Sequence, residues 1–314
     1  MKCFWMRALL CFALCAALLT GCALSPSSQP AESPTDPLTG QELVCPGQRP
    51  VAITIDNAAT NTTQWGLSTA SLVLEALTAQ QQATRLCLVY PAVGAVPQVG
   101  PVSAGQDLYW RLLVGQQVLP VQRGGGQFDQ NYLDYYSLRA VDALEVGTNA
   151  FSCETDWQNV PLWHTSGAAL SGVLGSLNIS PALTESRVTD TSSSSSDSES
   201  KTYRMLHADG TPQLDANNGQ QADFDNLLIL FSASTLRDDG VTLDYDLTMG
   251  GGVWLNEGHL WNITWTQGSE TTFFLYDSNG RPLTLTAGRS YLALVSSLTG
   301  QELTVQNSTG ESLL

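Results

Sequence analysis

The sequence predicts an α+β protein whose two halves carry different patterns. In the first half, short strand patterns are interspersed with segments of helical spacing. In the second half, nearly every apolar segment alternates with a period of two, which is typical of strands with one buried face. A Ser-dominated segment at 184–201 separates the two patterns. We therefore expect an α/β-patterned N-terminal half packed with a mostly antiparallel β C-terminal half.

The first 22 residues resemble the signal peptide of a bacterial lipoprotein. Lys2 and Arg7 supply positive charge ahead of an apolar run at 8–18, which is too short to cross a bilayer as a mature helix. The sequence Leu-Thr-Gly-Cys at 19–22 is similar to the bacterial lipobox, whose cysteine is released by cleavage and acylated. We expect lipidation at Cys22; the alternative is an ordinary secretory signal with a cysteine there by chance.

Residues 23–39 are rich in Ser, Pro and Thr. Such a composition buries too little apolar surface to fold, so we expect a disordered tether. Two or more acyl chains hold a protein stably at a bilayer. The sequence thus predicts a lipid-anchored protein on the extracytoplasmic face of the cell membrane, with domains at 40–183 and 202–314 joined by a flexible linker at 184–201.

Acidic residues outnumber basic ones, 29 to 13, which gives a formal net charge of −16. Loss of Lys2 and Arg7 with the signal peptide leaves 29 against 11, or −18. Such a surface repels nucleic acid and anionic lipid, and it favours solubility or cationic partners. We expect no nucleic-acid partner.

Three cysteines remain once the signal peptide is removed and Cys22 is acylated, namely Cys45, Cys87 and Cys153. An exported protein can hold a disulfide, but the sequence does not select the pair. Cys87 lies in a strand pattern and is expected to be a buried thiol. No C-x-x-C or H-E-x-x-H motif is present and the three histidines are widely spaced, so we expect neither a metal nor another cofactor.

The stretch 49–90 carries the strongest structural pattern. Residues 51–56 alternate as a strand with one buried face. Helical spacing from a Ser68 cap to Ala79 predicts a helix, and a second strand is expected at 84–90.

This strand–loop–helix–strand unit brings four polar residues into one region, namely Asp56, Asn57, Glu75 and Arg85. In one interpretation they line a polar binding cleft. In the other, Asp56 and Asn57 satisfy turn backbone groups, and Glu75 and Arg85 form an ion pair. We favour the structural interpretation, because a Glu–Arg pair is sufficient to orient a helix on a strand.

The middle of the N-terminal half combines glycines with short helices. Arg123 precedes three glycines, a run that could wrap an anion with backbone N–H groups. The Lys-Ser/Thr ending of a P-loop is absent, so we favour a tight turn. Short helices are predicted at 107–114, 138–144 and 168–177.

His164 is a further candidate binding residue. It follows Trp163, and a lone histidine in such a position is more often packed and hydrogen-bonded than catalytic. A pairing with Cys153 would make a Cys/His nucleophile, but nothing in the sequence places the two residues together.

The second half is predicted to be nearly all β. Strand patterns occur at 226–231, 243–247, 261–265, 271–276 and 291–295, and Asp-Ser-Asn-Gly at 277–280 is a hairpin-turn signal. The alternating tryptophans at 261–265 could form a carbohydrate platform, but Trp alternating with Ile is more typical of a sheet core.

An ordered set of motifs covers nearly the whole chain after the tether. The first motif is Arg-Pro-Val-Ala-Ile-Thr-Ile-Asp-Asn, and later motifs contain Glu75 and a Thr-Arg-Leu triplet. The motifs lie at 49–57, 65–67, 70–77, 84–86, 100–102, 250–252, 261–265, 274–280 and 283–294. Together these motifs resemble the YerB-like bacterial lipoproteins, a family of unknown function. The resemblance implies a layered sheet–sheet–helix architecture.

The chain departs from the family pattern in two places. Relatives carry two arginines where this chain has Ser103 and Gln106, and the His and Asn of a second family motif are displaced or missing at 161–166. Ser and Gln do not reproduce the bidentate contacts of Arg. If relatives bind an anion there, this chain is expected to bind it more weakly.

Catalytic motifs are missing or misplaced. Ser68 lies in no G-x-S-x-G element, and the S-x-x-K match at 198–201 falls in the Ser-rich linker. The sequence therefore favours a non-catalytic cell-envelope lipoprotein that binds a protein or peptide partner at the cell wall. The alternative is a cell-wall enzyme with an acid/base pair such as Asp56 and Glu75. A raised pKa of Glu75 would favour the enzyme, and a pKa lowered by Arg85 would favour the structural role.

Overall fold

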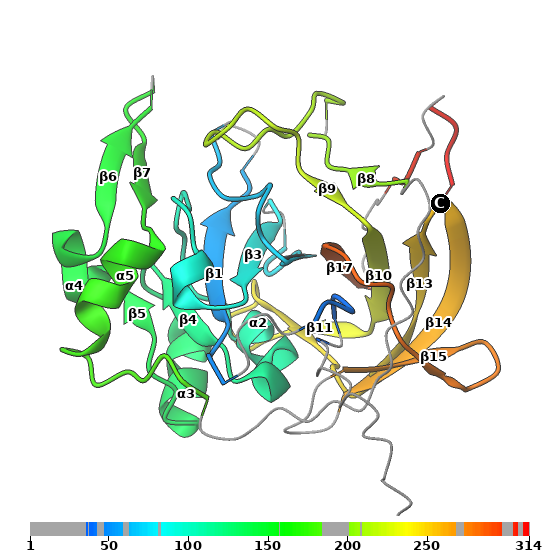
Figure 1. The fold of residues 1–314 in the computed structure, drawn as a ribbon. Coiled ribbons are helices and arrows are strands. Elements are labelled where there is room, and N and C mark those ends of the chain that lie inside the picture. Colours follow the sequence, from blue (N-terminus) through cyan, green and yellow to red (C-terminus); the bar gives the residue numbers. More distant parts are fainter. Residues whose placement is uncertain are drawn as a thin grey trace, which may run out of the picture. The chain divides into compact units, whose positions relative to one another are not determined.

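One mixed sheet runs through the part of the chain that this computed structural model describes (Figure 1). The described residues all fall within one unit, Pro34–Leu314. They are 36, 38–42, 47–58, 63–80, 83–156, 158–183, 201–207, 209–267, 273–296, 304–306 and 310–313. Cys22, Cys45 and the segment 184–200 lie outside them. Across the described ranges, no helix has the length and apolar character needed to cross a membrane.

The large sheet has the strand order β16-β15-β14-β13-β10-β17-β2-β3-β1-β4-β5, and three two-stranded sheets, β11–β12, β6–β7 and β8–β9, accompany it. The strands are β1 (Val51–Asp56), β2 (Leu72–Ala76), β3 (Arg85–Tyr90), β4 (Leu119–Gln122), β5 (Val141–Asp142), β6 (Ser152–Thr155), β7 (Pro161–His164), β8 (Tyr203–Arg204), β9 (Asp223–Phe224), β10 (Asn226–Ser232), β11 (Ser234–Leu236), β12 (Leu243–Tyr245), β13 (Met249–Asn256), β14 (His259–Gln267), β15 (Phe273–Asp277), β16 (Pro282–Leu283) and β17 (Ser290–Ser296). The helices are α2 (Asp107–Leu112), α3 (Gln127–Tyr135), α4 (Ala143–Val146) and α5 (Gly167–Leu174), with 3-10 turns at Val93–Ala95, Val114–Gln116 and Gly147–Asn149.

Strands from both halves of the sequence share the large sheet. β17 lies between β10 and β2 and is parallel to both, so that Tyr291 pairs with Leu227 on one side and with Val73 on the other. β1, β3 and β2 are antiparallel neighbours, and β4 and β5 continue from β1 in parallel. Strands β10 and β13 to β16 are antiparallel. The predicted α+β class with a β-rich C-terminal half is confirmed; the domain boundaries stay a prediction.

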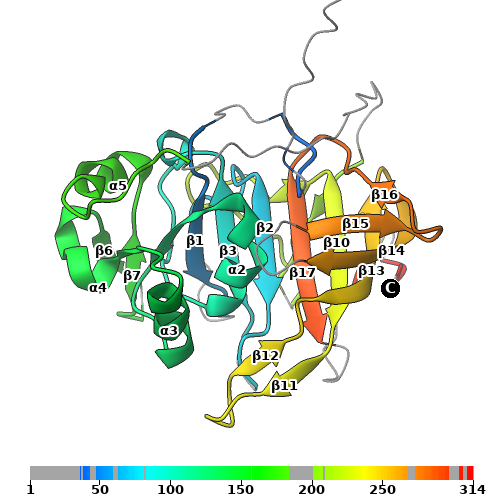
Figure 2. The ribbon, with the colours of Figure 1, turned by 90° about the horizontal axis from the view of Figure 1, so that it is seen from below.

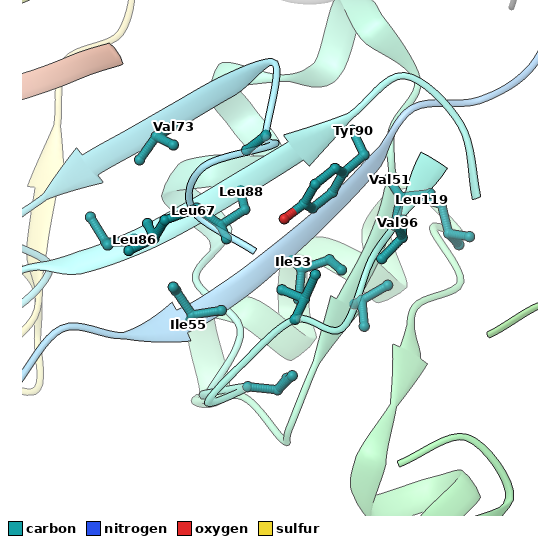
Figure 3. Packing of buried hydrophobic residues seen from close by; sticks show 14 of the residues in the cluster. Val51, Ile53, Ile55, Leu67, Val73, Leu86, Leu88, Tyr90, Val96 and Leu119 are labelled. Carbon is teal, nitrogen blue, oxygen red and sulfur yellow. The ribbon is translucent and has the colours of Figure 1, made fainter. Parts of the chain in front are cut away.

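Both faces of the central strands are buried. Val51, Ile53 and Ile55 of β1 point into one core, to which α5 contributes (Figure 3). Ala52 points into the other, to which α2 contributes. A strand covered on both faces carries an almost continuous apolar run instead of an alternating one.

The helix predicted from Ser68 to Ala79 is wrong, because this segment contains strand β2. Leu72, Val73 and Leu74 are consecutive and all buried, as a central strand requires. In the sequence, the same run also satisfies helical spacing, so periodicity alone does not separate the two. Ser68 caps no helix; its hydroxyl donates a hydrogen bond to Asp215 Oδ2 at 2.7 Å.

Three further elements differ from the sequence prediction. The helix expected at 138–144 is replaced by β5 and the start of α4, and the longer helix α3 lies earlier in the chain. α3 escapes a periodicity search because its buried residues are Leu133 and a carboxylate, Asp129. β13 was not expected because three glycines disfavour a strand. Two of them are needed for close packing, since a Cβ at Gly250 would lie 2.7 Å from the Trp265 ring and one at Gly252 would lie 2.6 Å from the Ile229 carbonyl oxygen.

Candidate functional site

The four polar residues predicted around β1, β2 and β3 do lie close together, but in two separate groups. Arg85 forms an ion pair with Asp56, with 2.5 Å between Nη1 and Oδ1. Glu75 does not contact Arg85; its carboxylate accepts hydrogen bonds from Asn57, at 3.2 Å, and from the Thr84 hydroxyl. The predicted Glu75–Arg85 ion pair is therefore wrong.

The pleat of the sheet explains this division. Successive side chains in a strand point to opposite faces. Asp56 and Arg85 are in register across β1 and β3, on the face that carries Ala52 and Cys87. Glu75 follows Val73 on the opposite face. The sequence prediction had a helix in place of β2, and a helix does not alternate its side chains between two faces. The incorrect Glu75–Arg85 pairing therefore follows from the incorrect helix.

Glu75 is the most unusual carboxylate of the predicted set. Tyr291, from the C-terminal half, donates its hydroxyl to Oε2, while Thr84 and Asn57 donate to Oε1. Burial raises the pKa of Glu75, and the hydrogen bonds from Thr84 and Asn57 only partly offset this effect. Its environment thus favours the protonated form more than an exposed site would.

Two glutamines extend this cluster towards the C-terminal half. Asn57 Oδ1 accepts hydrogen bonds from Gln64 Nε2 at 3.2 Å and from Gln213 Nε2 at 3.3 Å. Nearby, the fully buried Asp215 accepts from the backbone N–H groups of Gly66 and Ser68 at 3.1 and 2.9 Å. Sequence analysis missed Gln213 and Asp215, because an isolated polar pair outside any periodic segment gives no signal. These contacts fasten residues 213–215 to the loop that precedes β2.

His164 lies in a different environment from the Glu75 cluster. Its ring packs against Trp65, with 5.3 Å between ring centroids, and Nε2 lies 3.3 Å from Glu154 Oε1. Cys153 pairs with Trp163 across β6 and β7, whereas Ser152 pairs with His164. The thiol and the imidazole therefore point to opposite faces of this hairpin, and they do not form a Cys/His pair. Cys153 is an exposed free thiol, and Cys87 is buried as predicted.

Ser103 and Gln106 belong to a segment that runs beside the glycine-rich connection between β4 and α3, since the Gly105 N–H donates to the Gly124 carbonyl oxygen at 2.7 Å. The Ser103 carbonyl oxygen accepts from the Thr54 hydroxyl at 2.9 Å, and Gln106 precedes α2 without a side-chain capping bond. The glycine run makes a turn, as expected. Gly124 has a positive φ of 67° and its N–H donates to Asp142 Oδ1 at 2.8 Å. A Cβ at Gly125 would lie 2.0 Å from Asp129 Oδ2.

A groove of about 940 Å³ lies between helices α2 and α3 and the β11–β12 hairpin. Residues of α3 and of the β11–β12 hairpin line it, and both elements are labelled in Figure 2. Its lining is rich in aromatic and acidic side chains and includes Phe128, Tyr132, Tyr135, Tyr136, Asp246 and Gln267. Tyr135 is 82% exposed and contacts Tyr136, with 4.9 Å between ring centroids. Sequence analysis missed this groove, because its walls come from segments about 100 residues apart in the chain.

A network of ion pairs joins α2 to the β11–β12 hairpin. Arg237 donates to both carboxylate oxygens of Asp107, at 3.1 and 2.6 Å, and to Asp244 at 3.0 Å. Arg111 donates to Asp244 at 2.6 Å and to the carbonyl oxygen of Tyr245 at 2.9 Å. These contacts hold α2 against the β11–β12 hairpin on one side of the groove.

No group of three or more His, Cys, Asp or Glu residues suited to a metal ion occurs in the ranges that the structure describes.

Fold and surface together define an α+β protein built on one mixed sheet, with an open aromatic groove beside it. Residues 38–175 match the N-terminal domain, and residues 186–292 the C-terminal domain, of a family described as protein of unknown function DUF3048. The chain belongs to this family, which confirms the predicted resemblance. The crystal structure of the YerB protein from Bacillus subtilis is similar, with a TM-score of 0.67 and 21% sequence identity over 83% of this chain and 96% of that chain. At this identity the likeness shows the fold. A search of curated proteins found no match.

Proposed function

We propose that this chain is a non-catalytic, lipid-anchored protein of the cell envelope, and that it binds a protein or peptide partner through the groove between α3 and the β11–β12 hairpin. The observation that carries the proposal is the exposure of aromatic side chains in a preformed concave surface. Aromatic residues are enriched where proteins bind partners, and a groove of this size beside a fixed ion network needs little rearrangement to bind.

The anchor is supported by the N-terminal sequence. Replacement of the acylated cysteine, Cys22→Ala, should leave an uncleaved precursor, and treatment with globomycin, which blocks the lipoprotein signal peptidase, should do the same. Immunoblots of membrane and soluble fractions measure both effects. An unchanged, membrane-bound mature form of the Cys22→Ala variant would contradict lipidation at this residue.

The partner is tested by site-specific crosslinking in intact cells. A photoreactive amino acid in place of Tyr135 should capture a defined partner, because this side chain projects from the groove wall. The matched control is the same amino acid in place of Phe274, which is 51% exposed on β15 and is not among the residues that line the groove. Purified partner should then bind the Tyr135→Ala variant more weakly than the wild type. Equal crosslinking from both positions, or none from position 135, would count against the groove.

A second candidate function, a cell-wall enzyme that uses Glu75, has one observation in its favour, namely the raised pKa of that carboxyl group. Its proposed partner Asp56 lies on the opposite face of the sheet and is paired with Arg85. An acid/base pair of Asp56 and Glu75 is therefore not assembled. Release of soluble fragments from purified cell wall by the wild type, lost in Glu75→Gln, would favour the enzyme.

A further inference from the structure

The groove wall already packs one guanidinium group, that of Arg237. This group lies over the Phe128 ring, with 4.5 Å between Cζ and the ring centroid. It also makes two hydrogen bonds to the Asp107 carboxylate. An aromatic face and a carboxylate therefore hold a cation inside this part of the fold.

The rest of the groove adds a second aromatic cluster and a further carboxylate to this chemistry, while the Arg111 that also lines it is paired with Asp244 at 2.6 Å. Tyr132, Tyr135 and Tyr136 form an aromatic cluster, with 4.7 Å between the centroids of Tyr132 and Tyr136. Asp246 lines the same groove, and no ion pair among the described residues involves it. Hydrogen bonds from Thr248 lower the pKa of Asp246, so its carboxylate is charged at neutral pH.

Gln267 adds a further acceptor to this surface. Its side chain is only 8% exposed, and Nε2 donates to the carbonyl oxygens of Arg111 and Leu112 at 2.7 and 3.2 Å. Oε1 meets no hydrogen-bond donor in the described chain. A buried acceptor without a donor is costly, and because this oxygen has almost no solvent-exposed area, a ligand N–H group would reach it only if the side chains around it shift.

We propose that the groove binds an arginine or lysine side chain carried by an extended peptide segment of the partner. This inference rests on the proposed function and names the chemical class of its ligand. The cation stacks on the tyrosine cluster, as Arg237 stacks on Phe128, and donates hydrogen bonds to Asp246. The protein's excess of acidic residues, 29 against 13, steers a cationic segment towards this surface.

The charge of the groove argues against an anionic ligand. Asp107 and Asp244 are already neutralised by Arg111 and Arg237, which leaves Asp246 as the excess charge among the described lining residues. The two arginines are committed to these carboxylates, so neither is available to an incoming phosphate or carboxylate group.

The probe for this proposal is a short labelled peptide of alternating glycine and arginine, measured by fluorescence anisotropy with the purified protein at low ionic strength. A second peptide carries citrulline in place of arginine, which keeps the shape and removes the charge. The arginine peptide should bind roughly tenfold more tightly, since both cation–π stacking and the ion pair require the charge. Added salt should weaken it.

Two groove variants and two matched controls locate the binding. Asp246→Asn and Tyr135→Ala should each weaken binding of the arginine peptide by about threefold to tenfold. Asp209→Asn is the control for Asp246, because both carboxylates accept bonds from a threonine N–H at 2.9 Å and its hydroxyl at 2.6 Å. The control for Tyr135 is Phe274→Ala. Both controls should bind as the wild type does.

The proposal is overturned if wild type binds neither peptide, if the citrulline peptide binds equally well, or if the control variants lose as much affinity as the groove variants. Binding of an N-acetylglucosamine oligomer that Tyr135→Ala abolishes, with no binding of the arginine peptide, would overturn it in favour of a sugar ligand. A partner crosslinked from position 135 whose contact segment lacks arginine and lysine would leave the proposed function intact and refute this inference alone.

Discussion

Individual carboxylates in this protein differ by the partners that the fold gives them. Asp56 is paired with Arg85, and Asp215 accepts from backbone N–H groups. Glu75 and Asp129 are held by neutral donors, and burial raises the pKa of both. The sequence predicted that Asp56, Asn57, Glu75 and Arg85 lie in one region, and they do. It could not show that Arg85 pairs with Asp56, because that choice depends on which face each side chain occupies.

The ionisation of Asp129 should make the free energy of unfolding depend on pH. Burial raises its pKa from 3.8 to about 6. A raised native pKa means that the native state holds the proton more tightly, so this stabilisation is present below about pH 4 and is lost as the pH rises through about 6. The loss amounts to ~3 kcal/mol.

The variant Asp129→Asn has no carboxyl group to titrate, so its stability does not fall in this way as the pH rises. The Asn side chain has one acceptor oxygen in place of two, so it cannot accept hydrogen bonds from both Trp110 and Gln122 on separate oxygens. Urea unfolding of both proteins at about pH 4 and pH 7 measures the effect. The stability advantage of the wild type should shrink by ~2 kcal/mol between the two pH values, because the carboxyl group of the unfolded chain is already partly ionised at pH 4. An advantage that does not change with pH would refute the assigned environment of Asp129.

At the scale of elements, the strand patterns of the second half predicted β10, β12, β14, β15 and β17, because each of these is a short run with aliphatic, aromatic or β-branched residues on its buried face. The patterns did not predict strands whose two faces are both buried, as in β2, or strands in which glycines allow neighbouring groups to pack closely, as in β13. Position 250 is such a case, since a Cβ there would lie 2.2 Å from the Phe231 carbonyl oxygen. The groove could not be predicted either, because it needs the relative placement of α3 and β11–β12.

Alanine substitutions at two adjacent glycines of β13 test this packing. Gly250→Ala should destabilise the protein by about 1–3 kcal/mol, because the added methyl group would overlap Phe231 and Trp265. At Gly251 the same methyl group meets nothing within 4 Å, so Gly251→Ala should change stability by less than about 1 kcal/mol. Thermal or urea unfolding measures both. Equal destabilisation by the two variants would show that β13 is not packed as described.

At the scale of the molecule, the shared sheet ties the two sequence halves together. β17 supplies Leu292 and Leu294 to the core that contains Leu72 and Leu74 of β2. The contacts of Asp215 with Gly66 and Ser68 add a second, polar connection. Unfolding of one half would expose the edge of the sheet on which the other depends, so the halves should unfold together.

Limited proteolysis tests this connection. The Ser-rich composition at 184–201 predicts that the first cut falls there. The two fragments should then co-elute on size exclusion and unfold in one transition, because β17 remains paired with β2 and β10. Fragments that separate without denaturant, or early cleavage inside 49–90, would contradict the shared sheet.

Amide hydrogen exchange with and without the arginine-containing peptide tests most directly whether the groove, and not the cluster around Glu75, is the binding site. Binding should slow exchange in α3 and at 233–248, while exchange at 51–58 and 72–85 stays unchanged. Slower exchange at 51–58 and 72–85, with none in α3, would contradict the account and move the functional site to the Glu75 cluster.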